Sequence, residues 1–236
     1  MGVRRAHNIA TGGTLRRPTR IRFGEKAPTV RATTHHRPEC TSARGIIRDG
    51  TMKIILPTGE LTVPPEFQSF YTMQEDGIVK YPAPVLRKKA APVARLTPDI
   101  EALIDQMMAS LKWWNGLGIA APQVGVSMRV LILAPPDQPV RVVLNPRILE
   151  RSAEQVVDLE GCLSVPALYG KVKRARAVVV RGLNRRGKPI QLTLEGVSAR
   201  IAQHEIDHLD GVLFIDRVEP ESLFWNDPTP KEEETI

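Results

Sequence analysis

The residues of this chain whose types and spacing can do chemistry lie first in one short stretch, Gln203–His208. It contains the pattern His204-Glu205-x-x-His208, with two histidines four residues apart. On an α-helix, residues four apart share one face, so both imidazoles can bind one metal ion with the glutamate beside it. The pattern also occurs by chance. To make a catalytic site, the rest of the chain must supply a third ligand, a group that stabilises negative charge on the substrate and a slot for the substrate.

A catalytic site of the zinc type needs about three protein ligands and one open position for water. Proteases with this helix pattern take the third ligand from a histidine six residues further on or from a glutamate on a following helix. Here the first position is Phe214, and Glu219 is too near and adjoins Pro220. The five histidines of the chain are His7, His35, His36, His204 and His208. Cys162 is the remaining strong candidate, although a lone cysteine is more often a small core residue.

Another stretch, residues 116–125, is rich in glycine and alanine and contains Gln123. It follows an expected helix and not a strand, and it has no Lys-Ser/Thr pair, so neither a dinucleotide fingerprint nor a phosphate loop fits it. A tight turn with small residues for close packing is the simplest interpretation. Glycines also let a second backbone approach, such as that of a bound peptide, and Gln123 then offers a neutral donor at the end of that slot.

Two helices are expected to position these groups. Thr97-Pro98-Asp99 is a helix start signal, and apolar residues recur at helical spacing from Ile100 to Leu111 before Asn115-Gly116 ends the pattern. The second helix should run from about Val197 to Leu209, with apolar or functional residues on two stripes, which favours burial between sheets.

Short strands should form the rest of the folded region. The strand-like runs are Met128–Ala134, Arg141–Leu144, Gln155–Leu159, Val172–Leu183 and Ile190–Leu194. Because turns and not helices connect them, antiparallel pairing is expected. The predicted fold class is therefore α+β, with antiparallel sheets packed around a central metal-binding helix.

The positive charge of the chain is concentrated at its start. The net charge is +7, but residues 1–50 hold 11 of the 33 Lys and Arg residues and 3 of the 26 acids, so the remaining 186 residues carry −1. This distribution gives no reason to expect sequence-specific nucleic-acid binding by the folded part. Residues 1–72 are expected to be an extension without stable structure, with 51–72 as a linker, 73–225 as the catalytic domain and 226–236 as a tail. The extension is either an organelle transit segment or the result of an over-long start, since Met52 and Met73 are plausible starts.

The sequence lacks the features of membrane-spanning proteins and of secreted proteins held together by disulfides. No run approaches eighteen apolar residues, so a membrane span is not expected. The two cysteines, Cys40 and Cys162, are too few for a disulfide framework, and no secretory signal is recognisable, so a reducing compartment is expected.

Taken together, the three stretches resemble the peptide deformylase family. Gly116–Gln123 matches its Gly-hydrophobic-Gly-hydrophobic-Ala-Ala-x-Gln motif, Glu160–Ser164 matches Glu-Gly-Cys-Leu-Ser, and Gln203–His208 matches Gln-His-Glu-x-x-His. Tyr81–Arg87 is similar to the N-terminal signature of the family, and the resemblance covers about residues 76–218. Each motif alone is of limited specificity, but the three in this order are very specific.

The resemblance implies an enzyme that removes the formyl group from the N-terminal formyl-methionine of nascent polypeptides and releases formate. Metal-bound water would attack, with Cys162, His204 and His208 as the metal ligands and Glu205 as general base and acid. The Gln123 side chain and the Leu163 backbone N–H would stabilise the oxyanion. Ferrous iron is the usual metal of the family, and zinc, nickel or cobalt can replace it; the ligand set does not choose among them.

The resemblance also implies where a peptide would lie. Its backbone would pair with Gly118 and Gly161 like an added strand. The methionine side chain would enter a pocket lined by Leu117, Val197 and Ile201. Glu160 is expected either to anchor a metal ligand, with Arg174, or to be an ordinary surface acid. Docking on the ribosome near the exit tunnel is left open.

Two positions depart from the family pattern. Tyr169 stands where many members have an arginine that contacts the peptide, which puts that contact in doubt but not the chemistry. Arg200 replaces an aliphatic residue of many bacterial members. The sequence around it is similar to a subgroup shared by some bacteria and organelles, so the expected location is the bacterial cytoplasm or, if the extension is a transit peptide, a mitochondrion or plastid.

Two other functions remain as alternatives. A peptidase would use the same helix but a different third ligand, so Cys162→Ser would leave its metal and activity intact. A non-catalytic relative would bind nascent chains or use the metal structurally. The presence of Glu205 and Gln123 disfavours it, because a structural metal site would have a fourth protein ligand.

Overall fold

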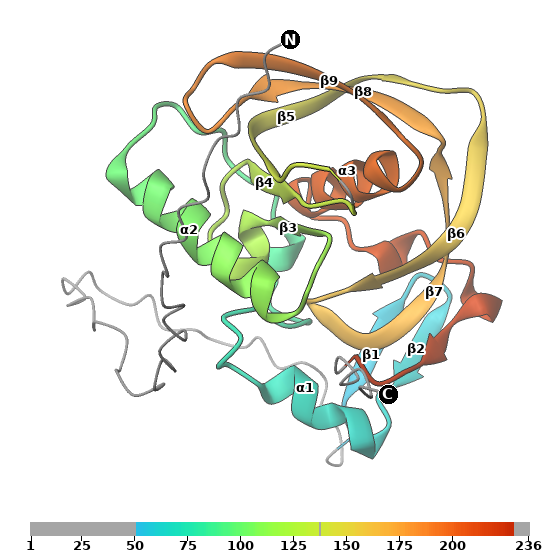
Figure 1. Ribbon diagram of the computed structural model, residues 1–236. Helices are drawn as coiled ribbons and strands as arrows, with labels where there is room; N and C mark the ends of the chain where they lie inside the picture. The colour runs from blue at the N-terminus through green and yellow to red at the C-terminus, as the bar shows by residue number, and fades with distance from the viewer. Residues whose placement is uncertain (1–50, 137, 229–236) are drawn as a thin grey trace, which may run out of the picture. The chain divides into compact units, whose positions relative to one another are not determined.

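Helix α3 (Gly196–Leu209) carries the His-Glu-x-x-His pattern and is buried along most of its length. It begins at Gly196, whose positive φ of 55° suits a residue without Cβ, and Asp210-Gly211 follows its last turn. In this computed structural model, which describes residues 51–136 and 138–228, α3 packs against strands of two different sheets (Figure 1). This burial between sheets confirms the interpretation of its two apolar stripes.

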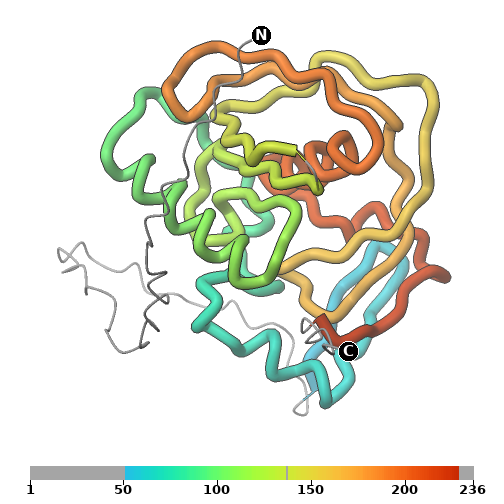
Figure 2. Tube along the Cα trace, viewed as in Figure 1, coloured from blue at the N-terminus to red at the C-terminus, as the bar shows by residue number. Residues whose placement is uncertain are grey.

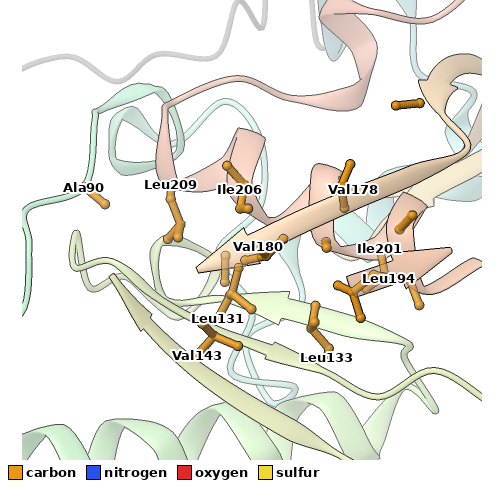
Figure 3. Packing of buried hydrophobic residues seen from close by; sticks show 14 residues of the cluster. Ala90, Leu131, Leu133, Val143, Val178, Val180, Leu194, Ile201, Ile206 and Leu209 are labelled. Atoms are coloured by element: carbon orange, nitrogen blue, oxygen red, sulfur yellow. The ribbon is translucent and has the colours of Figure 1, made fainter. Parts of the chain in front are cut away.

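A five-stranded antiparallel sheet lies on one side of α3. Its strand order is β3-β4-β5-β8-β9, and its members are β3 (Gly118–Ala120), β4 (Val130–Leu133), β5 (Arg141–Arg151), β8 (Ala177–Leu183) and β9 (Pro189–Glu195). Figure 3 shows Ile201, Ile206 and Leu209 of α3 facing apolar side chains of this sheet, including Leu131 and Val180. Because β4 is buried on both faces, it reads as a continuous apolar run and not as an alternating one.

The opposite face of the same sheet is covered by helix α2 (Pro98–Trp113). Its N-cap is Thr97, whose side chain accepts a hydrogen bond from Ile100 N at 3.4 Å, as the start signal predicted. Ile104 and Met107 are fully buried in the second core cluster. The predicted first helix is therefore confirmed within a residue or two.

A three-stranded sheet, with order β10-β7-β6, packs on the other side of α3. It consists of β6 (Gln155–Cys162), β7 (Val165–Ala175) and the short β10 (Phe224–Trp225). The sequence predicted one strand over Val172–Leu183, but the chain bends at Arg176, so that β7 belongs to this sheet and β8 to the five-stranded one. The residues around the bend, Lys173-Arg174-Ala175-Arg176-Ala177, include no glycine or proline, so no turn signal in the sequence marked it.

The expected linker over residues 51–72 is instead ordered. It forms the hairpin β1 (Lys53–Leu56) and β2 (Gly59–Thr62), a turn of 3₁₀-helix over Pro65–Phe67, and helix α1 (Gln68–Thr72). Three of its apolar side chains are buried in a third core cluster: Ile54, Val63 and Tyr71. The prolines that suggested a linker lie before and at the start of the 3₁₀ turn, where proline is well tolerated.

The start of the described chain lies beside its end. The blue and cyan hairpin and α1 run next to the red C-terminal segment along the chain trace (Figure 2), and Phe67 stacks on Trp225 with ring centroids 5.7 Å apart. Residues 1–50 and 229–236 lie outside the described residues, so the expectations for the extension and the end of the tail, including His7, His35, His36 and Cys40, remain expectations.

The antiparallel sheets and few helices confirm the predicted α+β class. Among residues 51–136 and 138–228, none of the helices has the length and apolar character needed to cross a lipid bilayer.

Candidate metal centre and substrate cleft

Three side chains that can bind a metal converge between α3 and the end of β6. The ligand atoms of Cys162, His204 and His208 all lie within 4.8 Å of one another, and Cys162 Sγ is 3.2 Å from His208 Nε2. Cys162 is the last residue of β6, after a register shift at Gly161 and before a tight turn into β7. The structure thus brings together the three residues that the sequence analysis selected as ligands.

The donor set fits a divalent transition metal. A thiolate and two imidazoles suit ions such as iron, zinc, nickel and cobalt. The Nδ1 atom of His204 is hydrogen-bonded to Glu160 Oε2 at 2.9 Å, which leaves the Nε2 atom of His204 for an ion. The Nδ1 atom of His208 is buried and has no hydrogen-bond partner among the described residues. Three ligands leave a fourth position open, as a catalytic site requires.

Glu160 anchors this centre to a buried ionic network. Its carboxylate accepts two hydrogen bonds from Arg174, each 2.9 Å long, and one from Arg200 at 2.7 Å. Arg174 also binds Asp207, which in turn accepts two hydrogen bonds from Arg217. Burial alone would raise the pKa of Glu160, but the hydrogen bonds from Arg174 and His204 outweigh it and hold that pKa well below its usual range. Of the two interpretations of Glu160, the structure therefore favours the anchor over the surface acid.

The contacts of Arg200 explain why this residue departs from the family pattern. Its side chain is 12% exposed and donates, besides the bond to Glu160, to the backbone carbonyls of Val156 and Val172 at 2.8 Å each. It therefore ties α3 to both strands of the β6–β7 hairpin. No motif marks this role of Arg200, and only the i, i+4 spacing from Arg200 to His204 could have suggested it.

Glu205 is buried beside the three ligands. Its Oε2 atom has no hydrogen-bond partner among the described residues. Burial, and secondarily the charge of Glu160, raise the pKa of Glu205 to about 7 in the ion-free protein. Gly118 approaches this carboxylate so closely that a Cβ there would lie 2.6 Å from Glu205 Oε1. The arrangement gives a carboxylate that faces a cleft and lacks a protein partner for one oxygen, as a proton acceptor requires.

Gln123 is held with its amide nitrogen towards the centre. Its Oε1 atom accepts a hydrogen bond from Ala120 N at 2.8 Å, so its Nε2 atom points to Cys162 Sγ, 3.7 Å away. The side chain is buried, and it follows the edge strand β3. The glycine-rich stretch is therefore part strand and part 3₁₀ turn, and not only the tight turn of the simplest interpretation.

A cleft of about 510 Å³ opens onto these groups. All of the predicted site residues except His208 line it: Leu117, Gly118, Gln123, Gly161, Cys162, Leu163, Val197, Ile201, His204 and Glu205. His208 is not among the lining residues and is 1% exposed, so it lies behind the other two ligands. Trp114, Asp158 and Pro228 also line the cleft, and no sequence motif marks them.

The two walls of this cleft contain the free edges of both sheets. Within the part of the chain that the structure describes, β3 and β6 are each paired on one side only. Gly118 belongs to the first edge and Gly161 to the second. Two strand edges that have no neighbouring strand thus line a cleft that ends at a three-ligand centre.

Comparisons with known proteins agree with this geometry. The sequence profile of the family described as "Polypeptide deformylase" matches residues 76–223. The peptide deformylase of Desulforudis audaxviator is 45% identical over 140 residues, which are 59% of this chain and 91% of that protein. The enzyme of Halothermothrix orenii is 48% identical over 136 residues, 57% of this chain and 88% of the relative.

Solved structures give the same answer. The Met-Ala-Ser-bound class I type b peptide deformylase from Acinetobacter baumannii superposes with a TM-score of 0.58 at 40% identity, covering 60% of this chain and 96% of the other. The peptide deformylase from Synechococcus elongatus in complex with actinonin has a TM-score of 0.58 at 37% identity, covering 60% and 78%. The profile match spans more than half of the sequence, including every residue of the centre and all but Pro228 of the cleft lining. The chain belongs to the polypeptide deformylase family of hydrolases.

Proposed function

We propose that this enzyme hydrolyses the N-formyl group of formyl-methionine at the start of newly made polypeptides and releases formate. The observation that carries the proposal is one cleft, lined by a buried carboxylate and by an edge strand of each sheet, that ends at a group of three side chains able to bind a metal. Family membership supports N-terminal deformylation as the reaction. The geometry adds which residues of this chain would do it.

Cys162, His204 and His208 would hold one divalent ion, with Fe²⁺ as the ion that we propose and Zn²⁺, Ni²⁺ or Co²⁺ as substitutes. When bound, the ion would lower the pKa of a water molecule and polarise the formyl oxygen. Glu160 fixes the ring orientation of His204 through its hydrogen bond to Nδ1. Arg174 and Arg200 keep Glu160 ionised for that purpose.

Glu205 would act as the general base and then as the general acid. Its carboxylate takes a proton from the attacking water and delivers it to the departing amine of methionine. The lack of a protein partner at Oε2 supports this role, because that oxygen is available to a water molecule. Burial raises the pKa of the Glu205 carboxyl group to about 7, so the group can take up and release a proton near neutral pH.

Gln123 and Leu163 would stabilise the negative oxygen that develops on the formyl carbon. The amide nitrogen of Gln123 already points into the centre because Ala120 N holds the other end of the amide. The N–H of Leu163 follows directly on Cys162 at the turn. Donors fixed in advance cost no reorganisation during the reaction, and loss of one typically costs about 3–4 kcal/mol of barrier.

The substrate would enter as an extended chain end. Its backbone would pair with the edges at Gly118 and Gly161, and its methionine side chain would lie against Leu117, Val197 and Ile201. All five residues line the cleft. The bound Met-Ala-Ser tripeptide in the Acinetobacter baumannii relative supports a peptide end as the occupant.

The test is formate release from formyl-Met-Ala-Ser by the ferrous protein prepared without oxygen. We expect turnover of the formylated peptide and no cleavage of its internal peptide bonds. A folded, metal-loaded sample that releases no formate would contradict the proposal. Cys162→Ser separates the peptidase alternative, because we expect this variant to lose the ion and the activity together.

A further inference from the structure

The two groups proposed to stabilise the oxyanion belong to different walls of the cleft. Gln123 follows β3 at the edge of the five-stranded sheet, and Leu163 lies in the turn between β6 and β7 of the three-stranded sheet. In residues 51–136 and 138–228, no strand is shared by the two sheets. Pairing between strands therefore does not set the distance between these two donors.

Residues 76–81, which we call the bridging segment, bind both walls through their backbone. Val79 N donates to the carbonyl of Gln123 at 2.7 Å. Tyr81 N donates to the carbonyl of Ser164, the residue after the second donor, also at 2.7 Å. Only one residue separates these two N–H groups along the chain. The segment thus connects the backbone of one proposed oxyanion donor to the backbone beside the other.

A buried ion pair holds the bridging segment in shape. Lys80 binds Asp76, and the two side chains are 4% and 0% exposed. Asp76 also accepts hydrogen bonds from Ile78 N at 3.0 Å and from Trp114 Nε1 at 2.9 Å. The Lys80 ammonium lies 5.7 Å from the centre of the Trp114 ring. Because residues 77–80 lie outside every helix and strand, these side-chain contacts fix their conformation in place of a regular ladder of backbone bonds.

The ion pair lies behind the cleft and not in its surface. Neither Asp76 nor Lys80 is among the residues that line the cleft, so a bound peptide would not touch them. Apolar side chains of similar size would often stabilise a fold as well as a buried ion pair does. A charged hydrogen-bonded pair has a narrower range of geometries than apolar contacts have. Its contribution here is therefore better described as placement than as stability.

We propose that the Asp76–Lys80 pair positions the two oxyanion donors relative to each other, so that both can bind the same oxygen atom. The inference rests on the proposed function and adds two positioning residues to it. Their effect passes through the bridging segment to Gln123 on one side and to the turn at Leu163 on the other. Loss of the pair should therefore slow the chemical step and leave peptide binding unchanged.

The experiment uses the variant Asp76→Asn/Lys80→Met, which removes both charges and keeps side chains of similar size. No charge is left unpaired, so we expect this variant to fold. In formate release from formyl-Met-Ala-Ser by the ferrous protein, kcat should fall about tenfold or more, because small misplacements of reacting groups can cost up to about 10²-fold. KM should stay within about twofold of the wild-type value. Elemental analysis should show that the ion is retained.

Lys80→Met alone is the second variant. It leaves Asp76 with its hydrogen bonds from Ile78 N and Trp114 Nε1, and it removes the contact that closes the bridging segment. We expect the same fall in kcat, again with KM and the ion retained.

A double-mutant cycle separates positioning from other effects on the centre. Gln123→Ala removes one of the two donors, so their relative position no longer matters, and adding the pair variant should then cost only about threefold in kcat. Val197→Ala, in the proposed methionine pocket, is the matched background, and there the full loss should remain. The Lys80 ammonium also interacts with the charge of Cys162, and an effect by that route would not depend on Gln123.

Met107→Ala is the control for stability. Met107 is fully buried on α2 and does not line the cleft. The variant should lower the urea midpoint because it leaves a cavity, and it should keep the wild-type kcat.

The outcomes separate the two proposals. Unchanged kcat in both pair variants, equal losses in the Gln123→Ala and Val197→Ala backgrounds, or loss of the ion would overturn the positioning role and leave deformylation standing. Failure of both pair variants to fold, or an equal loss of kcat in Met107→Ala, would assign the pair to stability and overturn it as well. No formate release by the metal-loaded wild type would overturn both proposals.

Discussion

Replacing Glu160 by glutamine should destabilise the protein far more than the same change at a surface ion pair. Glu160 and Arg174 have side chains that are each 4% exposed, and Arg200 also donates to the same carboxylate. Glutamine keeps the shape but removes the charge that two buried guanidinium groups face. Breaking a buried pair in this way costs about 3–5 kcal/mol, and because Arg174 keeps Asp207 as a partner we expect the lower end, about 3 kcal/mol.

Glu154 provides the matched control. It also binds an arginine, Arg176, at 3.0 Å, but the two side chains are 61% and 57% exposed. Glu154→Gln should therefore cost less than about 1 kcal/mol. Urea unfolding of both variants at pH 7, in the presence of a chelator, measures the free energy of unfolding without the contribution of a bound ion.

The difference in free energy of unfolding between wild type and Glu160→Gln should decrease as the pH falls. Since folding lowers the pKa of Glu160, its contribution is fully present above the ordinary value of 4.5 and is lost as the pH falls. The gap in free energy of unfolding should narrow by about 1.4 kcal/mol for each pH unit below that value. Equal losses for Glu160→Gln and Glu154→Gln at pH 7, or a gap that widens in acid, would refute the reasoning.

Three further predictions concern the centre and the chain start. Glu205→Gln should keep the bound ion, measured by elemental analysis, and lose formate release by a factor of about 10² or more; loss of the ion as well would mean that its role is misassigned. Gly118→Ala places a Cβ 2.6 Å from both the Glu205 carboxylate and Ile201, so kcat should fall about 10²-fold with the ion retained, and wild-type activity would contradict this close approach. Removing residues 1–50 should leave the urea midpoint unchanged, whereas removing 1–72 should lower it strongly, because the third core cluster loses fully buried side chains; equal midpoints would show that the hairpin and α1 do not stabilise the domain.

The sequence predicted the parts of the site whose geometry is local. The spacing of His204 and His208 determines their shared face once a helix forms, and Cys162 followed from elimination because a third ligand was required. The apolar periodicity before Asn115 likewise predicted α2. These inferences needed no knowledge of which segments meet in space.

What the sequence did not predict depends on contacts between distant segments. Tyr169 looked like the loss of a contact, because its stacking on Phe224 is visible only when β10 pairs with β7. Arg200 looked like a departure for the same reason, since its partners lie on β6 and β7. Residues 51–72 looked like a linker because their few apolar side chains become a buried cluster only against β7 and the segment after α3.

The origin of the three ligands has a consequence for folding. Cys162 belongs to the three-stranded sheet and both histidines to the helix packed on the five-stranded sheet, and His208 follows Cys162 by 46 positions in the sequence. An ion bound to all three is therefore a cross-link between the two halves of the domain, and by chain-entropy reasoning closing a loop of that length removes about 4 kcal/mol of freedom from the unfolded chain. The ion proposed for the reaction would thus also stabilise the fold. A chain that loses this ion would lose part of its free energy of unfolding together with its activity.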